Sequence, residues 1–121
     1  MIYRCLISGW RPRSTMDGQN ARLHWAARHK RTLSVHSLMA AKLAEADFPR
    51  VLAGPATVAL RVAQERGPLP DSDGVQAMLK STRDAIARWL GVDDGPTGPI
   101  TWEYSCHRGP DSVEIFLEVG E

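Results

Sequence analysis

The sequence predicts a single α+β domain in which two main helices pack on a mixed sheet, in the order β-α-β-α-β-β. Three observations predict this class. The length of 121 residues suits one domain, four segments are rich in β-branched and aromatic residues, and two longer segments repeat their apolar residues with a helical period. We therefore expect residues 1–121 to form one domain.

The first half of the chain predicts a strand, a loop and a helix. Residues 2–8 are rich in β-forming side chains and predict the strand. Residues 9–18 hold a proline and two glycines and predict the loop. Apolar residues with a helical period predict a helix over about residues 28–46, which Pro49 stops. Its start is left open, with Asn20 as a candidate cap.

The second half predicts a strand, a helix and two further strands. Residues 56–63 predict the strand, and a loop rich in proline and glycine follows it. The clearest element is an amphipathic helix from Val75 to Leu90, which Gly91 ends. Two alternating segments, residues 100–106 and 113–119, are separated by a turn and predict a β-hairpin.

The composition excludes several protein classes. No apolar run approaches the roughly 18 residues that a membrane helix needs, and the N-terminal segment lacks the apolar stretch of a signal peptide. Two cysteines, Cys5 and Cys106, are too few for a disulfide scaffold or a four-cysteine zinc site. We therefore expect a cytoplasmic protein with reduced thiols and no membrane partner.

The charge is distributed unevenly along the chain, although the net charge is only +1. Residues 1–50 carry nine Lys and Arg and three Asp and Glu, whereas residues 51–121 carry six and eleven. Cations mixed with an aromatic ring suit nucleic acid, because they neutralise phosphates and stack on bases. A solvated helix face with one buried Trp explains the same pattern. The candidate DNA-binding residues are Arg22, His24, Trp25, Arg28, Lys30 and Arg31.

Two pairs of aspartates bracket the second predicted helix. Asp71 and Asp73 precede it, and Asp93 and Asp94 follow it. Carboxylate oxygens suit Mg²⁺, and a bound Mg²⁺ stabilises charge on a phosphodiester. A straight helix of roughly 24 Å would hold the pairs apart, so they meet only if a loop or a partner chain brings them together. Asp73 also fits a helix N-cap, and the second pair also fits a plain turn.

A polar ridge is predicted along the same helix. At about 100° per residue, Lys80 and Asp84 each point within about 20° of Asp73. The Lys80–Asp84 spacing suits an ion pair on a solvated face. It equally suits a lysine that holds a phosphate or a leaving oxygen beside a metal.

These residues resemble the signature of RusA-type Holliday junction resolvases, which are common in phages and prophages. The matching series is Asp71-Ser72-Asp73-Gly74, then Lys80 and Asp84, then Asp93-Asp94. The segment Asn20-Ala21-Arg22-Leu23-His24-Trp25 is similar to phage members of the family. The resemblance covers most of the chain. It departs from the family at Gly74, where resolvases usually have Asn.

The resemblance implies a homodimeric, Mg²⁺-dependent endodeoxyribonuclease, with Mn²⁺ as an alternative ion, that resolves four-way DNA junctions by paired symmetric nicks. It also implies that the protein acts in the cytoplasm of a bacterial or phage-infected cell. Asp71, Asp73 and Asp94 match the metal-binding carboxylates, Asp93 is a helper, and Lys80 matches the lysine that stabilises the scissile phosphate. Two alternatives stay open: a nuclease of broader specificity for branched DNA, and a DNA-binding module whose catalysis is weakened because Gly74 replaces the Asn.

Overall fold

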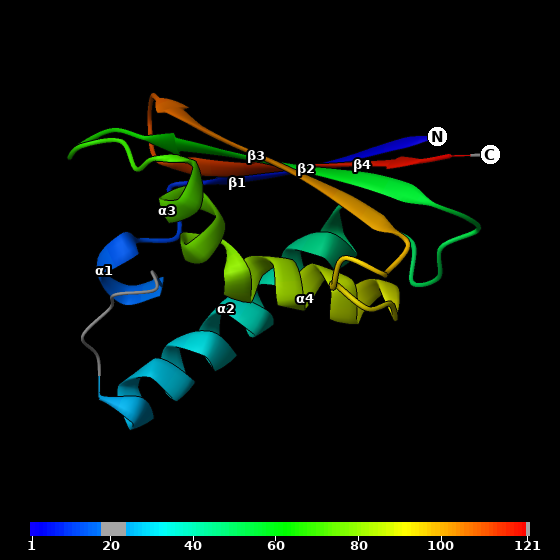
Figure 1. Cartoon of the computed structure of the whole chain (residues 1–121), viewed down its shortest axis with the longest axis horizontal. Helices are drawn as coiled ribbons and strands as arrows, with labels where there is room; N and C mark the ends of the chain where they lie inside the picture. The colour runs from blue at the N-terminus through cyan, green and yellow to red at the C-terminus, as the bar shows by residue number, and fades with distance from the viewer. Residues whose placement is uncertain (18–23, 121) are drawn as a thin grey trace.

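A four-stranded sheet carries the described helices on one of its faces (Figure 1). The computed structural model describes residues 1–17 and 24–120. The predicted α+β class is confirmed. In chain order the elements are β1 (Ile2–Ser8), α1 (Ser14–Asp17), α2 (Trp25–Glu45), β2 (Ala56–Gln64), α3 (Ser72–Met78), α4 (Lys80–Leu90), β3 (Ile100–Arg108) and β4 (Ser112–Val119).

The sheet is mixed and has the strand order β1-β4-β2-β3. Strand β4 pairs antiparallel with both β1 and β2, whereas β2 and β3 are parallel. The predicted hairpin of the last two strands is therefore wrong, because β2 lies between them. Most of β2 is buried, and a buried strand needs a partner at each edge to satisfy its backbone N–H and C=O groups.

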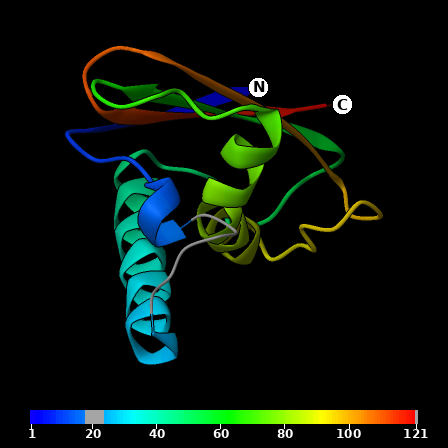
Figure 2. The same cartoon turned by 60° about the vertical axis from the view of Figure 1, so that its left-hand side comes forward.

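The core lies between the sheet and the helices, and Figure 2 shows these two layers in a second view. Alternate strand residues such as Leu60 and Ile115 point toward the helices and are fully buried. Three residues of α2, which are Val35, Met39 and Leu43, meet them from the helical layer. The other face of the sheet carries no helix within the described ranges and holds exposed charged residues.

The helices differ from the prediction at two points, the short helix α1 and a break in the second main helix. A short helix, α1, forms inside the predicted loop. The second main helix is interrupted at Leu79, whose ψ of 3° departs from the helical value, so that it becomes α3 and α4. Helix α2 begins at Trp25, and the candidate cap Asn20 lies outside the described residues. Gly91 ends α4 in the left-handed conformation, as predicted. Among the described helices, none is long and apolar enough to cross a membrane.

Candidate active site

An open cleft of about 810 Å³ lies between α2 and the α3–α4 segment. Helix α1 contacts both walls. Arg28 and Arg31 line the cleft from α2, and Asp73, Lys80 and Asp84 line it from the opposite wall. The polar ridge predicted from the helical period is therefore confirmed, even though Leu79 interrupts the helix. Cations and carboxylates therefore meet in one concave surface, which offers positive charge for a phosphate and oxygen ligands for a divalent cation.

The first aspartate pair divides between a helix cap and the cleft. The Oδ1 atom of Asp71 accepts a hydrogen bond from the backbone N–H of Gly74 at 2.8 Å, so Asp71 is the N-cap of α3. Asp73 is exposed in the first turn and lines the cleft. The interpretation of Asp73 as the cap is wrong, because the helix begins at Ser72. Asp71 is not among the residues that line the cleft.

Gly74 permits the close approach of the Asp71 side chain to the helix. A Cβ atom at position 74 would lie 3.0 Å from the Cβ atom of Pro70 and 3.1 Å from Oδ1 of Asp71. Both distances are shorter than ordinary van der Waals contact, so a larger residue would push the cap outward. The glycine that departs from the resolvase pattern is therefore matched to a tight local cap.

The second aspartate pair divides in the same way. The Oδ1 atom of Asp93 accepts a hydrogen bond from the N–H of Gly95 at 3.0 Å and stabilises a turn. The Oδ2 atom of Asp94 lies 3.3 Å from Nε of Arg83, and the same carboxyl group interacts electrostatically with Asp84. The loop after α4 thus folds back along the helix, which is one of the routes to convergence that the sequence leaves open.

Asp84 and Asp94 share one charged neighbourhood but have opposite pKa shifts. Burial raises the pKa of Asp84, and the hydrogen bond with Asp94 raises it further, while Lys80 opposes both effects. The hydrogen bond from Asp84 lowers the pKa of Asp94, and the positive charge of Arg83 contributes in the same direction. The pair therefore holds a proton on Asp84 more readily than on Asp94. The Nζ atom of Lys80 lies 3.7 Å from Oδ2 of Asp84.

Arg83 holds the Asp94 carboxylate in position and is itself contacted by two aromatic side chains. One guanidinium nitrogen donates a hydrogen bond to the hydroxyl of Tyr104 at 3.0 Å, and the Cζ atom lies 6.0 Å from the ring centroid of Trp102. Both aromatic residues belong to β3. Arg83 and Tyr104 are not among the residues predicted from the sequence, because only the fold brings β3 to this helix. The one available signal for Arg83 was its position next to Asp84.

The candidate DNA-binding residues have different environments. Arg22 lies outside the described residues. His24 caps α2, since its Nδ1 atom accepts a backbone hydrogen bond of 3.3 Å. Arg28 and Lys30 are exposed on α2, and only Arg28 of the two lines the cleft. Trp25 is 74% exposed, so the alternative of one buried Trp in this segment is wrong.

Arg31 takes part in a structural ion pair at the edge of the cleft. Two of its guanidinium nitrogens each lie 3.0 Å from a carboxylate oxygen of Asp17, and the Asp17 side chain is only 2% exposed. The guanidinium carbon lies 5.6 Å from the ring centroid of Trp10. Such a bidentate pair has a fixed geometry. It links α1 to α2 and neutralises much of the charge that Arg31 would offer to a phosphate.

The described carboxylates fit a two-carboxylate metal site better than a four-carboxylate one. Within residues 1–17 and 24–120, no three carboxylate, imidazole or thiol groups lie close enough to hold a metal ion together. Asp71 and Asp93 instead accept backbone hydrogen bonds. Mg²⁺ is commonly bound by one or two carboxylates, waters and substrate phosphates. Asp84 and Asp94 have the donor chemistry for that binding mode, and Asp73 lines the same cleft as Asp84.

Comparison with known proteins does not extend the resemblance. No protein-family model and no curated protein matches the sequence. The functional interpretation therefore depends on the residues of the cleft and on their chemistry.

Proposed function

We propose that this chain is a metal-dependent endonuclease that resolves four-way DNA junctions as a homodimer. One observation carries the proposal: a single cleft brings cations of α2 together with Asp73, Lys80 and Asp84, and Asp94 interacts electrostatically with Asp84. Cations hold a phosphodiester in place, and carboxylates hold the divalent ion that its cleavage needs. A two-fold dimer matches a two-fold junction and supplies two active sites.

Each of these groups has a chemical task. Asp84 and Asp94 would hold Mg²⁺ or Mn²⁺ together with water and a substrate phosphate, and Asp73 lines the same cleft as Asp84 without completing a three-carboxylate site among the described residues. The ion, when bound, activates water and stabilises charge on the phosphodiester. Lys80 contributes a fixed ammonium that stabilises negative charge on the reacting phosphate. Arg28 contacts a flanking phosphate and sets the register of the strand in the cleft.

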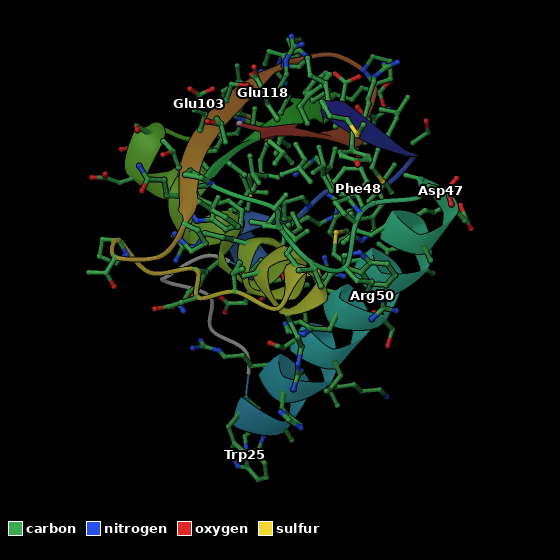
Figure 3. The ribbon with its side chains drawn as sticks, turned by 90° about the vertical axis from the view of Figure 1, so that its right-hand side faces the viewer. Trp25, Asp47, Phe48, Arg50, Glu103 and Glu118 are labelled. Atoms are coloured by element: carbon green, nitrogen blue, oxygen red, sulfur yellow. The ribbon has the colours of Figure 1, made fainter. Side chains whose placement is uncertain are left out.

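Nicking of a synthetic four-way junction tests the proposal. The wild type and Asp73→Asn are compared on the junction and on linear duplex, in Mg²⁺, Mn²⁺ or EDTA. Paired symmetric nicks that need both the metal and Asp73 support the proposal. Glu103→Gln is the matched control, because Glu103 lies on the sheet face turned away from the helices (Figure 3). Absence of cutting in both metals contradicts nuclease activity. Equal cutting of linear duplex or of other branched DNA instead indicates a broader nuclease.

A DNA-binding module without cleavage is the second candidate function. It is favoured by the hydrogen bonds of Asp71 and Asp93 to the backbone, because two of the four carboxylates in the resolvase-like series then have local structural tasks. Tight binding of the junction, with no nicks in either metal, would select this function. The basic surface of α2 would then be the principal functional region.

A further inference from the structure

The N-terminal end of α2 projects from the body of the protein and carries an exposed indole (Figure 3). Residues 24–30 are all exposed, and Trp25 has 74% of its surface accessible to water. The other three tryptophans, Trp10, Trp89 and Trp102, pack against the core. Trp25 is therefore the tryptophan whose ring face is open to a partner.

Trp25 lies on the face of α2 that lines the cleft. It precedes the buried core residue Leu43 by 18 residues, which is about five helical turns, so both side chains point in the same direction. Between them on this face, Arg28 and Thr32 line the cleft. The helix face that packs on the core thus continues outward as a cleft wall. Trp25 stands one turn beyond Arg28, at the open end of that wall.

The surroundings of Trp25 define the chemistry of its partner. The indole is flanked by the His24 ring at a centroid distance of 5.6 Å, and Arg28 follows it by one helical turn, about 4.5 Å along the axis. Lys30 is also exposed near this end of the helix, but it points about 140° away from Trp25. A cation one turn from a flat ring on the same side of the helix complements a polyanion with exposed bases, and it disfavours an apolar protein surface.

We propose that Trp25 stacks on an uncovered base face of the DNA strand whose phosphates are held in the cleft. The inference rests on the proposed function and adds a source of substrate selectivity to it. In a continuous duplex both faces of each base are covered by its neighbours, whereas a branch point or a single strand leaves faces free. The cations of the cleft bind any phosphate backbone, so Trp25 is the residue that favours branched or single-stranded DNA.

DNA binding without cleavage tests the stacking role. Dissociation constants for a single-stranded oligonucleotide, a four-way junction and a linear duplex are measured in EDTA at one salt concentration. Trp25→Ala is expected to weaken binding of the first two roughly 5- to 100-fold, with little change for the duplex. Trp25→Phe should restore most of the loss. Leu33→Ala is the matched control, because Leu33 is another exposed apolar residue of α2 and should leave all three constants unchanged.

Tryptophan fluorescence supplies an independent readout of the contact. The single strand should quench wild-type emission, and Trp25→Ala should lose that response. Equal behaviour of Trp25→Ala and Leu33→Ala overturns the inference, as does an equal loss on duplex. A shift of Trp25→Ala from dimer to monomer with unchanged affinity also overturns it, because a second copy of the chain then covers the indole. Wild-type protein that binds none of the three DNAs contradicts the proposed function itself.

Discussion

Two aspartates stand at each end of the α3–α4 segment, and each pair divides its tasks. Asp71 and Asp93 accept backbone hydrogen bonds of 2.8 and 3.0 Å. Asp73 faces the cleft, and Asp94 meets Asp84 and Arg83. The first carboxylate of each pair thus stabilises the local backbone, and we propose that the second takes part in the reaction.

The pairs differ in how firmly the second carboxylate is held. Asp94 is positioned by Arg83, which is itself hydrogen-bonded to Tyr104 of β3. In contrast, Asp73 is exposed to water in the first turn of α3. A preorganised group needs little rearrangement when it binds a charged ligand, and a solvated one needs more. The comparison shows that proximity in sequence does not make two carboxylates one functional unit.

Removal of the Lys80 ammonium, which lies beside Asp84, should have the largest effect, and that effect should be on the nicking rate. Lys80→Ala should slow nicking of a four-way junction by about 10²- to 10³-fold, because it removes a charge that stabilises the reacting phosphate. Its ion pair with Asp84 leaves Lys80 66% exposed, so the folded state should lose little stability. Single-turnover rates and thermal melting check both expectations. Arg88→Ala, at an exposed position on the same helix, should retain the wild-type rate.

Removal of the Arg83 guanidinium tests whether Asp94 is held more firmly than Asp73. Arg83→Leu should lower the free energy of unfolding by about 1–3 kcal/mol, because the Tyr104 hydroxyl and the Asp94 carboxylate lose a shared charged donor. Arg83→Lys should recover only part of this loss, since an ammonium cannot reproduce the planar geometry. Urea unfolding measures the difference. Wild-type stability in Arg83→Leu would contradict the positioning role.

The structural members of the two pairs should show a smaller effect, on stability alone. Asp71→Ala should lower the free energy of unfolding by about 1 kcal/mol, because Gly74 loses its capping acceptor. Asp73→Ala should leave stability close to the wild-type value, because the side chain is exposed and is not the cap. Chemical unfolding of both variants checks the order. A larger cost for Asp73→Ala would reverse the assignment of the two aspartates.

The smallest effect concerns pH. The folded-state pKa of Asp84 is raised above 3.8, mainly by burial. Its contribution to stability is therefore full at acid pH and is lost as pH rises through the folded-state pKa. Asp94 has the opposite sign: its lowered pKa contributes stability above 3.8, which is lost as pH falls. Between about pH 4 and pH 7, the free energy of unfolding should fall less with rising pH in Asp84→Asn than in the wild type. An unchanged profile would contradict the coupling.

Local patterns in the sequence predict much of this fold. The strand over Ile2–Ser8, the helix end at Gly91 and the ridge formed by Asp73, Lys80 and Asp84 are all confirmed. Each depends on side-chain period or on the conformation of one residue, and both are visible over a few positions. The exposure of Trp25 is not visible in this way, because it depends on how far α2 extends past the core.

Long-range contacts account for what the sequence could not predict. The position of β2 between β3 and β4 is a matter of strand pairing across the chain, and a short turn is compatible with either arrangement. The meeting of Asp84 with Asp94 depends on the path of the loop after α4. Asp71 rather than Asp73 caps α3 because the helix begins at Ser72. The absence of a side chain at Gly74 leaves room for the Asp71 carboxylate to approach the backbone.

Four single Asp→Asn variants, compared in one assay, test the division within the pairs most directly. Junction nicking in Mg²⁺ is measured for substitutions at Asp71, Asp73, Asp93 and Asp94, with melting curves to confirm that each variant is folded. Loss of cutting at Asp73 and Asp94, with cutting retained at Asp71 and Asp93, is the predicted result. Equal loss at all four positions would indicate one undivided carboxylate site and would contradict the division.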